Sequence, residues 1–106
     1  MATTLQPPRW TADQILCILR AHRTELRQMG VRRIGLFGSF RHDHSDEESD
    51  IDLLVKLAHP SFDRYMAVRF YLEDLLGRDV DLVLENGLTP EALGTILPDA
   101  MVIDSI

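Results

Sequence analysis

The sequence predicts an α/β (α+β) domain, in which a small mixed β-sheet of about three strands is flanked by helices. Apolar residues recur at helical spacing in long stretches, short apolar runs lie between these stretches, and Gly or Pro stands where elements would end. The 106 residues and 45% hydrophobic content suit one compact domain, residues 1–106, with residues 1–10 as a flexible N-terminus.

Three helices are predicted from this spacing. The first covers residues 11–29, because Thr11 is a suitable N-cap and Gly30 ends the apolar pattern. The second covers residues 61–76, and the third runs from Thr89-Pro90 to about residue 97.

Three strands are predicted between these helices. Residues 31–37 and 51–57 are short apolar runs, and residues 79–84 alternate with period two. The tail, residues 100–104, allows a further short extended piece.

Several classes of protein are disfavoured by composition. No apolar run approaches the roughly 20 residues that cross a bilayer, and the N-terminus lacks the pattern of a secretory signal, so the expected location is the cytoplasm. The single cysteine, Cys17, offers neither a disulfide nor a cysteine-rich metal site, and we expect it to be a small core residue.

The net charge of −6 argues against a general nucleic-acid binder, which needs clustered Lys and Arg. Much of the acidity lies within ten residues, 43–52. Such a cluster is either a solvated loop or a site for cations, and the spacing of its members must decide between the two.

Asp50 and Asp52 carry the clearest chemical signal. Side chains at i and i+2 of a strand point to the same face, so the two carboxylates meet at one spot. Their mutual repulsion is relieved by a divalent cation, and Mg²⁺ prefers carboxylate oxygens together with substrate phosphates. A nucleoside triphosphate is the natural third party.

The strand over residues 79–84 offers a further carboxylate, from either Asp79 or Asp81. If this strand lies beside residues 51–57, one of the two completes a three-carboxylate site. We favour Asp81, because an acid between Val80 and Leu82 is costly unless a site uses it, whereas Asp79 suits a solvated strand start.

Gly38 and Ser39 follow the first predicted strand directly. Glycine lets the backbone turn and approach a ligand closely, and the serine hydroxyl and N–H suit phosphate oxygens. The order strand, Gly-Ser, Asp-x-Asp, strand, helix and Asp-bearing strand, over residues 31–84, resembles the DNA polymerase β superfamily of nucleotidyltransferases, specifically the minimal nucleotidyltransferase (MNT) family.

The resemblance implies the nucleotidyltransferase fold, with ATP as substrate and two Mg²⁺ ions. It gives Gly38 and Ser39 the role of holding the triphosphate. It implies that the catalytic and metal-binding residues are Asp50, Asp52 and Asp81, of which Asp81 also helps to activate the attacking hydroxyl.

One segment departs from the family pattern. After Gly-Ser and one variable residue the family commonly has Ala-Arg-Gly, whereas this chain has Arg41-His42-Asp43. Arg41, or else His42, would then assist the triphosphate. His42 and His44 stand beside acids in a predicted loop, which is typical of solvated histidines rather than of metal ligands.

Proteins of this kind commonly act as the antitoxin for a HEPN-type ribonuclease toxin, so the resemblance implies a hetero-oligomer and AMP transfer to a tyrosine of the toxin. One alternative is a non-catalytic antitoxin that binds through residues 61–76, whose apolar stripe is wide enough to be either core or partner surface. Another is a small-molecule, aminoglycoside-type nucleotidyltransferase.

Overall fold

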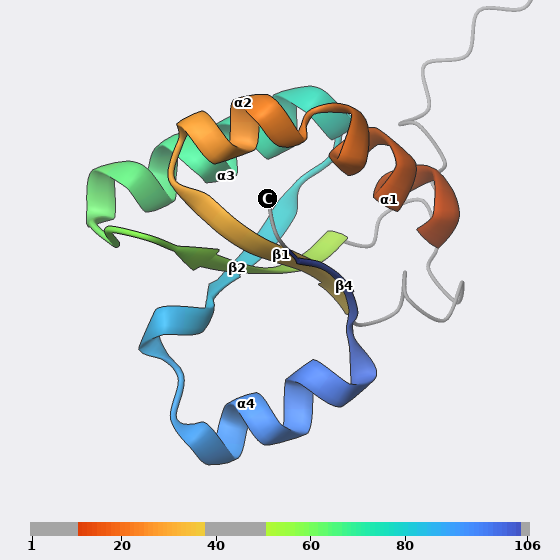
Figure 1. Cartoon of the computed structure of the whole chain (residues 1–106). Helices are drawn as coiled ribbons and strands as arrows, with labels where there is room; N and C mark the ends of the chain where they lie inside the picture. Colours follow the sequence, from red (N-terminus) through yellow and green to blue (C-terminus); the bar gives the residue numbers. More distant parts are fainter. Residues whose placement is uncertain (1–10, 38–50, 105–106) are drawn as a thin grey trace, which may run out of the picture.

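The computed structural model describes residues 11–37 and 51–104 (Figure 1). The predicted N-terminal segment 1–10 lies outside these residues, as do Gly38, Ser39, Arg41 and Asp50. The described elements are, in chain order, α1 (Ala12–Ala21), α2 (Arg23–Gln28), β1 (Val31–Phe37), β2 (Ile51–Leu57), α3 (Phe62–Leu76), β3 (Val80–Leu84), the 3₁₀ turn η2 (Glu85–Gly87), α4 (Pro90–Ile96), the 3₁₀ turn η3 (Leu97–Asp99) and β4 (Met101–Ile103).

The strands form one mixed sheet in the order β3-β2-β1-β4. β1 is antiparallel to both β2 and β4, whereas β2 and β3 are parallel and joined through α3. The helices α1, α2 and α3 cover one face, and α4 lies on the other (Figure 1). The predicted α/β class is thus confirmed, with β4, from the predicted extended tail, as a fourth strand.

The core lies between the sheet and the α1–α3 layer. Alternate residues of β2 enter it, and its members from β2 are Ile51, Leu53, Val55 and Leu57. Because strand side chains alternate between faces, Asp52, Leu54 and Lys56 belong to the opposite face, which carries α4. The sheet therefore separates an apolar helical layer from a face that bears carboxylates.

The predicted single helix over residues 11–29 is wrong, because the chain forms α1 and α2 with a break at His22. At His22 the backbone has φ −108° and ψ 18°. The His22 Nδ1 atom lies 2.9 Å from the Ile18 carbonyl oxygen, which also accepts the His22 backbone N–H at 3.2 Å. The side chain and the backbone N–H of His22 thus share one acceptor, and no Gly or Pro marks the break.

The helix ends follow their sequence signals. Thr11 and Gln14 form a reciprocal capping box at the start of α1. Ser61 and Thr89 accept backbone N–H groups at the starts of α3 and α4. Gly77 ends α3 in the left-handed conformation, with φ 66°.

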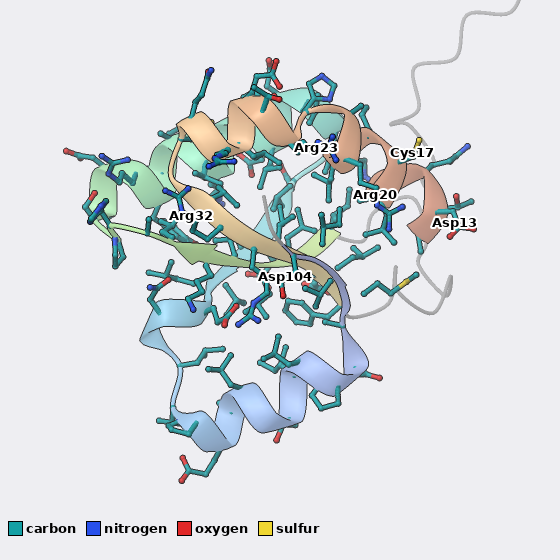
Figure 2. All side chains as sticks on the ribbon, viewed as in Figure 1. Asp13, Cys17, Arg20, Arg23, Arg32 and Asp104 are labelled. Carbon is teal, nitrogen blue, oxygen red and sulfur yellow. The ribbon has the colours of Figure 1, made fainter. Side chains whose placement is uncertain are left out.

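Cys17 is exposed, so the prediction that it is a core residue is wrong. The inward positions of α1 are Ala12, Ile15, Leu16 and Leu19. Cys17 lies about 100° around the helix from Leu16 and points outward, as Figure 2 shows. Among the described residues, no helix is long and apolar enough to cross a membrane.

Candidate active site

The register of the β2–β3 pair brings two of the predicted carboxylates together. Asp52 lies directly beside Asp81 across the parallel ladder. Neighbouring strands are about 4.8 Å apart, and in-register residues of a parallel pair point to the same face. Asp52 and Asp81 therefore form a pair of adjacent carboxylates, the Asp52–Asp81 pair.

The pair lies on the open part of the α4 face of the sheet. Asp81 is exposed and Asp52 is partly exposed, whereas Ile51 and Leu82 next to them are buried on the other face. Adjacent carboxylates that face solvent are accessible to a cation and to a phosphorylated ligand. Their positions on strands, rather than on loops, fix the directions of their side chains.

Hydrogen bonds hold the start of β3 from two sides. The Ile51 backbone N–H donates to the Asp79 carbonyl oxygen at 3.0 Å. On the outer side, the Val80 backbone N–H donates to Glu73 Oε2 at 3.3 Å. The Tyr65 hydroxyl donates to the Leu82 carbonyl oxygen at 2.5 Å, so two α3 side chains bind the outer edge of β3. The backbone on both sides of Asp81 is thereby held in place by hydrogen bonds.

The opposite end of the β2–β3 pair is fastened by polar side chains after β3. Asn86 accepts the Leu57 backbone N–H at 2.9 Å and donates to the Leu57 carbonyl oxygen at 3.0 Å. Arg33 of β1 reaches the buried Glu85, with Arg33 Nε donating to Glu85 Oε2 at 3.1 Å and Arg33 Nη2 contacting the other carboxylate oxygen. The hydrogen bond to Glu85 raises the pKa of the Arg33 guanidinium, against the opposing effect of burial.

β1 ends beside the same carboxylates. Phe37, its last residue, lies opposite Asp52 in the antiparallel β1–β2 pair. Of the residues predicted for the site, the structure brings Asp52 and Asp81 together, whereas Gly38, Ser39, Arg41 and Asp50 lie outside the residues that it describes.

The choice of Asp81 has a different physical basis from the one expected. Asp81 is exposed, so its position carries no burial cost, and it is the register with Asp52 that supports its role. Asp79 is also exposed and precedes β3, in line with a solvated strand start. Sequence reasoning missed Glu73, Tyr65 and Asn86 as supports, because their contacts join residues that no local motif connects.

The Asp52–Asp81 pair fits the donor chemistry of Mg²⁺, which takes one or two carboxylates and completes its shell with water and phosphate oxygens. Within residues 11–37 and 51–104, no group of three or more His, Cys, Asp or Glu side chains could hold a metal ion. Of the predicted three-carboxylate set, these ranges contain only Asp52 and Asp81.

Comparison with known proteins identifies the relatives of this arrangement. The model of the nucleotidyltransferase domain family matches residues 19–102. The protein adenylyltransferase MntA of Thermococcus cleftensis is 40% identical over 95 residues, which cover 88% of this chain and 96% of that protein.

Solved structures agree with the sequence relatives. One described as a candidate minimal nucleotidyltransferase superposes with a TM-score of 0.75 at 29% identity, over 88% of this chain and 96% of the other. A chain from the complex of the tri-AMPylated Shewanella oneidensis HEPN toxin with its MNT antitoxin superposes with a TM-score of 0.62 at 20% identity, over 87% and 73%. The second likeness concerns the fold.

Proposed function

Since this chain belongs to the nucleotidyltransferase domain family and is a nucleotidyltransferase of the minimal type, we propose that it is an antitoxin that transfers AMP from ATP to a tyrosine of a HEPN-type ribonuclease toxin. The observation that carries the proposal is the in-register Asp52–Asp81 pair on the open face of the sheet. The chemical class of the relative, a protein adenylyltransferase, supports AMP as the transferred group and a protein as the acceptor.

The reaction requires that the acceptor oxygen attack the α-phosphorus of ATP. A new P–O bond forms to the tyrosine oxygen, the bond between the α-phosphorus and the bridging oxygen breaks, and pyrophosphate leaves. Two bound Mg²⁺ ions would neutralise the phosphates and steady the entering and leaving oxygens.

The residues of the chain have positioning and charge-balancing roles in this proposal. Asp52 and Asp81, with Asp50, would hold the metal ions. Asp81 would also draw the proton from the attacking hydroxyl, because its exposed carboxylate is accessible to an incoming acceptor.

Residues near the end of β1 would serve the nucleotide. Gly38 and Ser39 would hold the triphosphate, and Arg41 would offset its negative charge. These assignments rest on the family resemblance and on the position of Phe37 beside Asp52.

Labelled ATP tests the proposal directly. We expect the full chain, with Mg²⁺ and the purified ribonuclease encoded beside it, to transfer label from the α-phosphate to the partner. Asp52→Asn and Asp81→Asn should each lower the rate on the order of 100-fold or more, because each removes transition-state stabilisation. Asp79→Asn is the matched control, since Asp79 is an exposed acid in the same segment, and it should retain most of the activity.

A chelator provides a second arm of the same experiment. Removing divalent metal should abolish transfer, and adding Mg²⁺ back should restore it. Equal rates for wild type, Asp52→Asn and Asp79→Asn would contradict the proposed role of the Asp52–Asp81 pair.

A non-catalytic antitoxin remains the second candidate, and one observation favours it: two phenylalanines of α3 are exposed, as expected of a binding surface. On this alternative, Asp52→Asn would neutralise the toxin as well as wild type does. Loss of neutralisation by a variant that still binds the toxin would exclude it.

A further inference from the structure

One side of α3 carries an apolar row that the fold leaves in solvent. Phe62, Met66 and Phe70 follow one another at four-residue spacing, so they lie along one side of the helix. Phe62 is 76% exposed, Phe70 is 59% exposed, and Met66 is partly buried. We call these three residues the α3 stripe.

The core of the protein does not account for the stripe. α3 is anchored on the sheet by Val68, Leu72 and Leu76, all of them fully buried. At about 100° per residue, Phe70 lies roughly opposite these anchors. The only other large hydrophobic side chain exposed among the described residues is Val102, at 37%, so the α3 stripe is the principal apolar surface there.

Acidic residues border the stripe on one side. Asp63 and Asp74 are both exposed, and helical geometry places them within about 40° of Phe70 around the axis. Of the two arginines in α3, Arg64 lies about 120° around the axis from Phe70, and Arg69 is paired with Glu73 at 3.5 Å. The stripe therefore has an acidic border on one side and the Arg69–Glu73 ion pair on the other, on a chain whose net charge is −6.

We propose that the α3 stripe is the docking surface for the ribonuclease partner, an inference that rests on the proposed function. A protein that cleaves RNA needs a cationic surface to hold the phosphate backbone. The surface of the ribonuclease that fits the α3 stripe is an apolar pocket that receives Phe62 and Phe70. Lys or Arg residues around this pocket would face Asp63 and Asp74. Docking there would place negative charge against the surface that the partner uses for RNA.

The charges disfavour a second copy of this chain as the occupant. Two α3 helices packed antiparallel about a two-fold axis bring the same sides of both helices together. The Asp63 and Asp74 side of one copy would then meet the same acidic side of the other, and like charges placed together weaken association. A cationic partner meets no such repulsion.

The stripe and the Asp52–Asp81 pair lie on different sides of the molecule. α3 belongs to the helical layer on one face of the sheet, whereas the carboxylates belong to the α4 face (Figure 1). A partner held by the α3 stripe therefore leaves the carboxylates uncovered. Docking of the partner and binding of ATP should accordingly be separable by mutation.

The test measures the affinity of the full chain for the purified ribonuclease encoded beside it. The double variant Phe62→Ala/Phe70→Ala should bind at least about 30-fold more weakly, as expected when central aromatic anchors are truncated. Its affinity for ATP and Mg²⁺, measured by calorimetry, should equal that of wild type. Arg64→Ala, which alters an exposed residue on another side of α3, is the matched control and should bind the partner normally.

A charge variant provides an independent arm. Asp63→Lys/Asp74→Lys should slow association and reduce its dependence on salt, because steering by opposite charges is lost. Both double variants should keep the wild-type circular dichroism spectrum, since all four side chains are exposed.

Two results would overturn the inference. One is unchanged partner affinity in the Phe62→Ala/Phe70→Ala variant. The other is a wild-type dimer that this variant converts to monomer, which would assign the stripe to a second copy. Failure of the proposed function would give a different result. A partner that binds through the stripe but is never labelled by ATP would refute AMP transfer and leave the docking surface established.

Discussion

Asn86 illustrates how one residue extends a strand pair beyond its last bridge. Its side chain bonds to both the N–H and the carbonyl oxygen of Leu57, as a neighbouring strand would. No role for Asn86 was predicted from the sequence, because Asn86 and Leu57 are 29 positions apart. Their contact exists only after β2 and β3 have paired.

We expect Asn86→Ala to lower the free energy of unfolding by about 1 kcal/mol, through the loss of two hydrogen bonds that compete with water. Urea denaturation measures the change. Asn86→Asp, which keeps an acceptor for the Leu57 N–H but loses the donor, should fall between wild type and Asn86→Ala. Identical midpoints for all three would show that the contact contributes nothing.

Tyr71 should make the stability of the folded protein depend on pH in the alkaline range. Burial, and secondly the nearby charge of Glu25, raise the pKa of the Tyr71 phenol above its ordinary value. The folded state therefore holds this proton more tightly than the unfolded state. The resulting stability is fully present below the unfolded pKa, near 10, and is lost as pH rises through the raised pKa of the folded state.

The expected outcome is that wild type loses more stability than Tyr71→Phe when the pH is raised from 9 to about 11. Thermal unfolding at matched ionic strength measures both proteins. Parallel pH profiles would be inconsistent with the raised pKa.

The helices and strands whose ends are marked by nearby residues in the sequence were predictable. Features that depend on contacts beyond such local markers were not. The bounds of β1 and β2 equal the predicted ones, because the apolar runs end at Phe37 and Leu57. The His22 break escaped prediction because no Gly or Pro marks it in the sequence. Asp81 was predicted from sequence, but the pairing that supports its role depends on the order of strands.

Alanine in place of Gly77, which ends α3, and in place of Gly94, inside α4, should change the stability of the protein in opposite directions. Gly77 has φ 66°, so Gly77→Ala should cost about 1 kcal/mol of stability. Gly94 lies inside α4 with no atom within 4 Å of an added Cβ, so Gly94→Ala should stabilise by about 0.5–1 kcal/mol. Chemical denaturation of the two variants beside wild type tests the pair, and changes of the same sign would contradict the assigned conformations.

At the scale of the whole molecule, Arg33 joins segments from three strands. Arg33 belongs to β1, and its side chain contacts Glu85, which follows β3. The Arg33 Nη1 atom also lies 3.8 Å from Oδ2 of Asp104, which follows β4. Asp104 is labelled in Figure 2, beside the end of β4. The Glu85 side chain is only 5% exposed, and Arg33 is the cationic side chain that contacts it.

Arg33→Met should destabilise the protein by about 1–3 kcal/mol, because it leaves the buried Glu85 carboxylate without its partner. Arg32→Met is the matched control, since Arg32 is the exposed neighbour on β1, and it should change stability little. Adding Glu85→Gln to Arg33→Met should recover part of the loss. Equal unfolding midpoints for the two single variants would show that the ion pair is unimportant.

The Asp52–Asp81 pair and the exposed phenylalanines of α3 lie on opposite sides of one sheet, and this placement has an evolutionary consequence. Each surface can accumulate substitutions without disturbing the other, since the buried layer between them carries the stability. If the α3 stripe docks the partner as proposed, a descendant that had lost AMP transfer would still recognise its target, and one paired with a new target would need changes on a single helix.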